Sequence, residues 1–248
     1  MRPVALVTGA GRGIGAATAL LAGQRGYAVC VNYLRNREAA EAVASAIHGF
    51  GGQAIAVAAD VSDEADVMRL YATIDRDLGP VTALVNNAGI LERQMPVAAM
   101  EPARWQRVFA TNVFGSFLCA REAVRRMSNR QGGCGGAIVN VSSLAARTGS
   151  PHEYVDYAAS KGAIDSFTRG LAAEVADQGI RVNAVRPGFI ATDMHASGGE
   201  PDRIERVKAF VPLKRGGRAE EVAQAVLWLL SDQACYTTGA FIDVAGGR

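Results

Sequence analysis

The sequence predicts a single-domain α/β fold in which about seven parallel strands form a doubly wound sheet with helices on both faces. Short apolar runs alternate with longer amphipathic stretches along the chain, and most of the apolar runs are unbroken, as in strands covered on both sides. A length of 248 residues fits one α/β domain. Neither a linker nor an internal repeat divides the chain, so we expect residues 1–248 to form one domain.

The expected strands are short runs rich in apolar and β-branched residues. Such runs are typical of parallel strands whose two faces are both buried. In chain order they are Val4–Thr8, Ala28–Tyr33, Ala54–Ala58, Ala83–Val85, Ala137–Val141, Arg181–Val185 and Ala240–Val244.

The expected helices lie between these strands and have amphipathic patterns. They are Ile14–Arg25, Arg37–His48, Asp63–Leu78, Trp105–Met127, Tyr154–Ala176 and Ala219–Leu230. We expect Ser62 to cap the third helix. The long Gly- and Pro-containing segment 188–217 interrupts the rhythm, and we expect it to be a substrate lid with a helix around 201–210.

Bulk properties exclude several functions. A formal net charge of +2 gives no basis for a nucleic-acid or membrane-surface partner. No apolar run approaches the roughly 18 residues of a membrane span. The three histidines lack metal-ligand spacing, so no metal is expected. The four cysteines form no C-x-x-C pair and the N-terminus has no signal-like apolar region, which together predict a cytoplasmic protein.

A glycine-rich segment, Thr8–Gly15, follows the first strand and opens the first helix. In this context Gly9 permits a tight turn, Gly11 or Gly13 lets the backbone approach a pyrophosphate, and Gly15 allows close helix–strand packing. The helix N-terminus, at Ile14, then offers N–H groups to phosphates. The segment predicts a Rossmann-like dinucleotide site.

The end of the second strand indicates which dinucleotide binds. Cofactors with a free ribose 2′-hydroxyl usually meet a carboxylate there, but no acidic residue occurs before Glu38. Arginines at 12, 35 and 37 suit a 2′-phosphate, although Arg35 and Arg37 are also compatible with a solvated helix start. We predict that NADP(H) is preferred over NAD(H), with Arg12, Tyr33 and Arg35 at the cofactor.

Tyr157 and Lys161 are spaced to share one helix face. A phenol has a reference pKa of about 10, and a nearby ammonium lowers it toward the range useful for acid–base catalysis. Tyr154 lacks such a partner, since Ala158 stands four residues on, and we expect it in the wall or core.

Together these segments resemble the short-chain dehydrogenase/reductase family along the whole chain, and 3-oxoacyl-[acyl-carrier-protein] reductases in particular. The motifs that carry the resemblance are Thr8–Gly15, Asp60-Val61, Asn86-Asn87-Ala88-Gly89, Asn112, Ser142-Ser143, Tyr157-x-x-x-Lys161, Pro187-Gly188 and Thr192. Ser143 stands 14 residues before Tyr157, one more than in many members, so Arg147–Asp156 carries a small insertion beside the site.

The resemblance implies a role for each matching residue. Tyr157 is the proton donor, Lys161 tunes it and binds the nicotinamide ribose, Ser143 positions the substrate oxygen, and Asn112 holds a proton-relay water. The cofactor contacts implied are Asp60 and Val61 at the adenine, Asn87, Ala88 and Gly89 at the ribose, and Pro187, Gly188, Ile190 and Thr192 around the carboxamide. The residues alone leave open that Asn112 is simply a satisfied core amide.

The expected reaction is hydride transfer between a nicotinamide and a small-molecule carbonyl or secondary alcohol. Within the family, a 3-oxoacyl thioester reductase is the first interpretation and a sugar or polyol dehydrogenase the second. A non-catalytic NADP(H) sensor is a further alternative. The expected pocket lies among Ile90–Met95, Leu144–Tyr154, Phe189 and Asp193–Val211, and the family implies a homotetramer.

Overall fold

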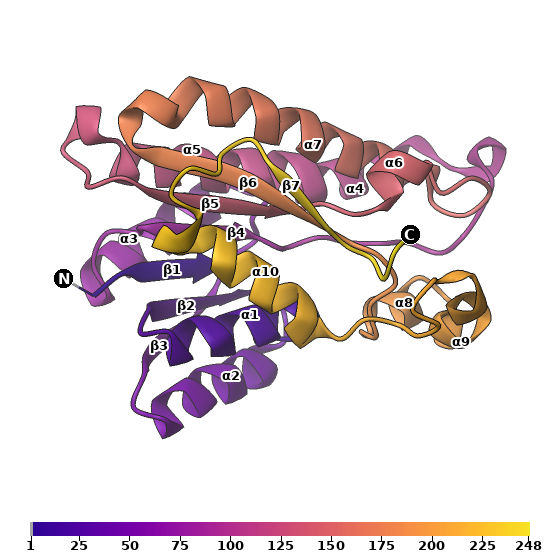
Figure 1. Ribbon diagram of the computed structural model, residues 1–248, viewed down its shortest axis with the longest axis horizontal. Coiled ribbons are helices and arrows are strands. Elements are labelled where there is room, and N and C mark those ends of the chain that lie inside the picture. The colour runs from indigo at the N-terminus through magenta and orange to yellow at the C-terminus, as the bar shows by residue number, and fades with distance from the viewer. Residues whose placement is uncertain (1) are drawn as a thin grey trace.

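The computed structural model describes residues 2–248 and contains one sheet of seven parallel strands in the order β3-β2-β1-β4-β5-β6-β7 (Figure 1). The strands are β1 Val4–Val7, β2 Ala28–Tyr33, β3 Gln53–Ala58, β4 Ala83–Asn86, β5 Gly136–Val141, β6 Ile180–Pro187 and β7 Phe241–Val244. The α/β fold with a doubly wound parallel sheet is therefore confirmed.

Helices cover both faces of the sheet (Figure 1). Their bounds are α1 Gly13–Gln24, α2 Arg37–Gly49, α3 Glu64–Asp77, α4 Pro102–Phe109, α5 Gly115–Met127, α6 Ala145–Thr148, α7 Val155–Val175, α8 Met194–Ser197, α9 Arg203–Val207 and α10 Ala219–Leu230. No helix within residues 2–248 is both long and apolar enough to cross a membrane.

Successive side chains of β1 alternate between two buried clusters, as the two-residue period of a strand requires. Ala5 and Val7 belong to the cluster shared with α1, α2 and α10, whereas Val4 and Leu6 belong to the cluster shared with α3, α5 and α7. All four side chains are almost completely buried. This double burial explains why the strands have unbroken apolar sequences.

The order of the strands reverses at β1, which pairs in parallel with β2 on one side and with β4 on the other. The carboxyl ends of these three strands therefore lie at the same edge of the sheet. Ligands of doubly wound folds bind outside the carboxyl ends of the strands at such a switch point. The lid segment lies at this edge, where α8 and α9 stand beyond the strand ends in Figure 1. The helix expected around 201–210 is present as α9 followed by a 3₁₀ turn, Lys208–Phe210.

Two local predictions were wrong. Asp63, not Ser62, caps α3 by accepting a 2.8 Å bond from the Asp66 backbone, because the Ser62 hydroxyl donates to the Asp60 carboxylate at 2.6 Å. The single helix expected over Trp105–Met127 is divided by a π-helical segment, Ala110–Phe114, between α4 and α5. Such insertions are frequent at functional sites.

Candidate functional site

The glycine-rich loop joins β1 to α1 at the switch point. Gly9 and Gly13 have φ angles of +61° and +55°, which favour glycine. A Cβ at Gly15 would come within 2.5 Å of the Gly9 carbonyl oxygen and the Asn87 amide nitrogen. Gly11 has no such close contact, since a Cβ there would lie 3.6 Å from its nearest neighbour, the Ala40 nitrogen.

Asparagine side chains hold this loop against its neighbouring strands. Asn32 in β2 accepts a bond from the Gly9 N–H at 3.2 Å and donates to Ala59 at 3.1 Å. Asn87 donates to the Thr8 and Gly9 carbonyls at 2.8 and 3.1 Å. Asn87 thus supports the loop and also lines the cavity described below. The structural role of Asn32 was not predicted from the sequence.

The loop geometry fits a dinucleotide. Helix α1 begins at Gly13 without a side-chain cap, so backbone N–H groups of its first turn are available to a ligand. A Cβ at Gly13 would lie 3.3 Å from the Thr192 methyl group, and one at Gly89 would lie 3.6 Å from Lys161 Nζ. The absence of a side chain at both glycines therefore leaves room beside Thr192 of the lid and beside Lys161 of α7.

The residues expected at the adenosine surround the ends of β2 and β3. Arg12 and Arg35 are exposed, and Tyr33 is half-buried. Asp60 binds the Ser62 backbone and hydroxyl with one carboxylate oxygen, and Val61 is buried. Arg37 is a solvated residue of α2 that pairs with Glu41 at 2.6 Å.

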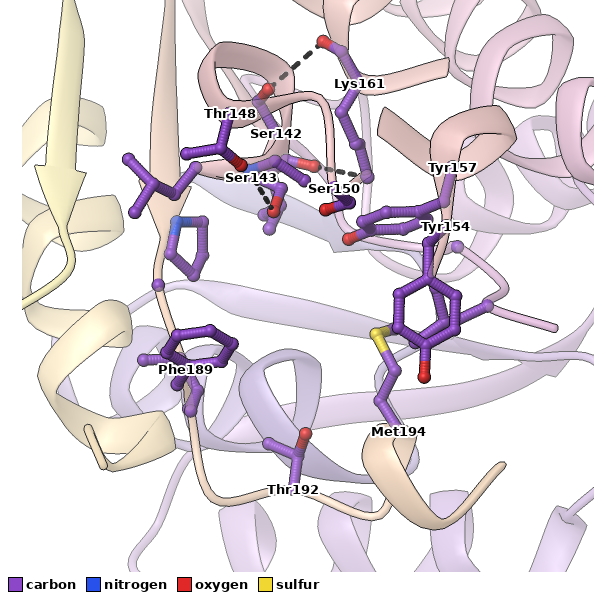
Figure 2. Close-up of a pocket in the computed structure, with 18 of the residues that line it drawn as sticks. Ser142, Ser143, Thr148, Ser150, Tyr154, Tyr157, Lys161, Phe189, Thr192 and Met194 are labelled. Carbon is purple, nitrogen blue, oxygen red and sulfur yellow. Dashed lines mark hydrogen bonds between the residues drawn. The ribbon is translucent and has the colours of Figure 1, made fainter. Parts of the chain in front are cut away.

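Tyr157 and Lys161 lie on α7 and face the segment after β5 that contains Ser143 (Figure 2). The Lys161 ammonium donates a 2.7 Å bond to the Val141 carbonyl and lies 5.6 Å from the centre of the Tyr157 ring. The Ser143 hydroxyl accepts a 3.1 Å bond from the Ala145 N–H. The structure therefore brings the three residues together around one cavity.

Burial has the largest effect on the pKa values of Tyr157 and Lys161. It raises the pKa of Tyr157 to about 12, although a hydrogen bond with Ser143 acts in the opposite direction. Burial also lowers the pKa of Lys161 to about 8, opposed by the nearby Asp165 carboxylate. The expected lowering of the tyrosine pKa by lysine is not found here, because desolvation of the phenol outweighs the opposing hydrogen bond with Ser143.

Asn112 sits in the π-helical segment behind these residues. Its amide accepts from the Ile90 N–H at 2.8 Å, and donates to the Ile90 carbonyl and the Ser160 hydroxyl, both at 3.1 Å. The side chain is buried, and these bonds satisfy its donor and acceptor. In this structure Asn112 thus fastens the loop after β4 to α7 next to Lys161.

Ser142 has a different task from its neighbour. Its hydroxyl donates to the Asp165 carboxylate at 2.6 Å. The 3.3 Å contact of the same hydroxyl with the Lys161 carbonyl is drawn in Figure 2. Arg186 from β6 holds the same carboxylate through two nitrogens at 2.9 and 2.7 Å. This buried network, which sequence reasoning missed, fixes α7 to the strand ends.

A cavity of about 340 Å³ opens between the strand ends, α7 and the lid. Ten residues expected at the site line it: Ile14, Asn87, Gly89, Ser143, Tyr157, Lys161, Pro187, Gly188, Ile190 and Thr192. Tyr154 lines the cavity and is buried, which confirms its expected place in the wall.

The expected substrate surroundings are only partly correct. Of Ile90–Met95, Leu91 alone is in the wall, while Glu92 pairs with Arg107 at 2.8 Å. The insertion contributes Ser150, Pro151 and Glu153 to the wall. Arg203 lies within the expected lid range Asp193–Val211, although no motif singled it out, and sequence reasoning missed Arg248.

Known proteins share this architecture. Residues 9–248 match the family described as enoyl-(acyl carrier protein) reductase. An uncharacterized oxidoreductase, YgfF, of Escherichia coli strain K12 is 62% identical over 99% of both chains. A 3-oxoacyl-[acyl-carrier-protein] reductase of Synechocystis is 42% identical, covering 98% of this chain and 96% of its own.

Structural similarity agrees with these matches. A short-chain type dehydrogenase/reductase from Mycobacterium marinum superposes with a TM-score of 0.92 and 34% identity, covering 99% of this chain and 94% of its own. These matches cover the segments that form the parallel sheet, the glycine-rich loop and the Tyr157–Lys161 pair. The chain is an oxidoreductase of the short-chain dehydrogenase/reductase family.

Proposed function

We propose that this protein is an NADP(H)-dependent reductase of 3-oxoacyl thioesters, with Asn112, Ser143, Tyr157 and Lys161 as its catalytic group. The observation that carries the proposal is the convergence of Ser143, Tyr157 and Lys161 on one cavity beside the glycine-rich loop. Relatives named 3-oxoacyl-[acyl-carrier-protein] reductase support the substrate class.

Tyr157, Ser143 and Lys161 each have a separate role in the proposed reduction. A bound nicotinamide supplies the hydride for reduction. Tyr157, kept protonated by burial, donates its proton to the substrate oxygen. Ser143 donates a hydrogen bond to the same oxygen, which stabilises the charge that develops on it. Lys161 places a positive charge beside Tyr157 and stabilises the phenolate left after proton transfer.

The cofactor contacts follow the order of the loop and strand ends. We propose that Gly9, Gly11, Gly13, Ile14 and Gly15 bind the pyrophosphate, and that Asn87, Ala88 and Gly89 bind the ribose side. Asp60 and Val61 take the adenine, and Arg12, Tyr33 and Arg35 take the 2′-phosphate end. Pro187, Gly188, Ile190 and Thr192 hold the carboxamide, with segment 188–217 as the lid.

The assembly and location are also proposals. A homotetramer is supported by membership of a family that is typically oligomeric, and a mass measurement in solution tests it. A single monomeric mass would contradict it. The cytoplasmic location and the single domain over 1–248 remain predictions from the sequence.

The first experiment is an assay of NADPH and NADH oxidation against a panel of carbonyl compounds. The panel contains acetoacetyl thioesters, diketones, quinones and keto-sugars, and sugars and polyols are tested in the reverse direction. Turnover of acetoacetyl thioester with NADPH supports the proposal. Turnover of sugars or polyols alone would favour the dehydrogenase alternative, and tight NADPH binding without turnover of any compound would favour a sensor.

A further inference from the structure

A cluster of four charges ties the lid to the insertion before α7. Glu153 in the insertion accepts hydrogen bonds from Arg203 and, at 3.0 Å, from Arg206. Glu200, three residues before α9, accepts from the same two arginines at 2.9 Å. Two carboxylates and two guanidiniums balance each other, so the cluster is held without a net charge.

Arg203 is the buried member of this cluster. Its side chain is 7% exposed, whereas that of Arg206 is 51% exposed. The Arg203 guanidinium carbon lies 5.0 Å from the centre of the Tyr154 ring and 5.3 Å from that of Phe189. These two rings stand on either side of the cavity in Figure 2, and Arg203 is part of its wall.

The space available to a substrate is small. A cavity of about 340 Å³ is at the lower end of the range of ligand sites, about 300–1,000 Å³. Its wall includes Asn87, Gly89 and Thr192, which the proposed function assigns to the cofactor. The rest of the wall, which includes Tyr154, Phe189 and Arg203, is left for the substrate beyond its reacting carbonyl.

A long apolar chain in that part of the cavity meets a buried guanidinium. Methylene groups packed against Arg203 exclude the remaining water from its guanidinium and offer no hydrogen bond in exchange. Moving Arg203 aside instead breaks its bonds to Glu153 and Glu200 and separates a largely buried charge from its counterions. Either route costs binding energy that a short substrate does not lose.

We propose that Arg203 is a specificity-determining residue that ends the substrate pocket and restricts the enzyme to short-chain carbonyl substrates, of acetoacetyl size. The inference rests on the proposed function and narrows it to short 3-oxoacyl thioesters. Glu153 and Glu200 hold Arg203 in this position, and the insertion that carries Glu153 thereby contributes to substrate choice.

The test compares N-acetylcysteamine thioesters of acetoacetate, 3-oxooctanoate and 3-oxododecanoate, reduced with NADPH by the wild type, Arg203→Met and Arg206→Met. We expect wild-type kcat/KM to fall at least about tenfold from acetoacetyl to 3-oxooctanoyl thioester. Arg203→Met removes most of that fall, mainly by lowering KM for the longer substrate. Arg206→Met is the matched control, since it contacts the same carboxylates but is absent from the cavity wall, and it keeps the wild-type dependence.

A binding measurement keeps the inference separate from the proposed function. Calorimetry with the 3-hydroxybutyryl and 3-hydroxyoctanoyl thioesters reports the pocket length without turnover, and Arg203→Met should tighten the longer ligand selectively. The variant Arg203→Met/Glu153→Gln is used if Arg203→Met does not fold, because it also removes one carboxylate. Equal binding of both lengths by the wild type, or an unchanged ratio in the Arg203 variants, would overturn the inference. Absence of turnover with length-selective binding would contradict the proposed reaction alone.

Discussion

The Lys161 ammonium donates a 2.7 Å hydrogen bond to the backbone carbonyl of Val141, the last residue of β5. This bond joins the helix that carries Tyr157 to the strand that leads into Ser143. It also gives the buried ammonium a polar partner, without which burial would favour the neutral amine still further. The geometry of the reacting group and the charge of Lys161 therefore depend on the same contact.

The charge of Lys161 predicts how reduction depends on pH. Burial lowers the pKa of Lys161 to about 8, whereas it raises the pKa of Tyr157 to about 12. As pH rises through about 8, lysine loses its proton first while tyrosine keeps its own. We expect kcat/KM for carbonyl reduction, which reports ionisations of the free enzyme and substrate, to be constant below this pH and to decline above it. A rate independent of pH between 6 and 10 would contradict the assignment.

Removing the charge of Asp165 should move this decline. Asp165 opposes the effect of burial on Lys161, and Arg186 binds the Asp165 carboxylate. Tyr157 and Asp243 are further ionisable groups beside Lys161 and Arg186, respectively. Asp165→Asn removes the negative charge and leaves Arg186, so the decline is expected at lower pH, by about one pH unit. Asp243→Asn removes the more distant carboxylate bound by Arg186, at 3.5 Å, and serves as the control with a wild-type profile.

Tyr157→Phe tests the proton donor. The substitution keeps the ring and removes the hydroxyl, so kcat should fall by a factor on the order of 10²–10⁴ or more. NADPH affinity, measured by fluorescence titration, should change little, because the glycine loop is untouched. Tyr236→Phe provides a matched control, since Tyr236 is fully exposed. Retention of most activity by Tyr157→Phe would refute the assignment.

Local patterns predicted the parts of the site whose chemistry is encoded over a few residues. The glycine loop and the Tyr157–Lys161 pair were found because a turn at positive φ and a shared helix face require particular residue types at fixed spacing. The strands were found because double burial makes them continuously apolar. Their predicted limits differ from the observed ones by at most two residues.

Features built from distant segments were not predicted. The Arg203–Glu153 contact spans 50 residues and the Arg186–Asp165 contact spans 21, and neither has a local signature. A π-helical segment interrupts the expected continuous helix at Asn112, whose side chain bonds Ile90, 22 residues earlier. The pKa of Tyr157 departed from expectation for a similar reason, since its burial depends on the whole surroundings.

Cofactor preference is tested at the end of β2. Arg35→Ala removes one of the cations proposed for the 2′-phosphate, and a charge-assisted contact is worth about 1.5–3 kcal/mol. The dissociation constant of NADPH should therefore rise by about tenfold to a hundredfold, while that of NADH stays nearly unchanged. Arg37→Ala should have a smaller effect, because Glu41 already binds its guanidinium. Comparable wild-type affinity for both cofactors would contradict the preference for NADP(H).

The Arg104–Asp156 pair predicts a large loss of stability. Their side chains are 4% and 2% exposed, and two guanidinium nitrogens bind the carboxylate at 2.6 and 3.0 Å. Asp156→Ala leaves the arginine buried without its counterion, which should lower the free energy of unfolding by about 3–5 kcal/mol. Urea unfolding at a fixed protein concentration measures this change.

A double variant distinguishes the cost of an unpaired buried charge from the cost of lost packing. Arg104→Met/Asp156→Ala contains no unpaired charge, so it should recover a large part of the stability lost in Asp156→Ala. Because Asp156 directly precedes Tyr157 on α7, the single variant should also lower kcat more than KM changes. Equal stability of Asp156→Ala and the wild type would mean that the buried arginine finds another partner, and that this pair does not hold the start of α7 in place.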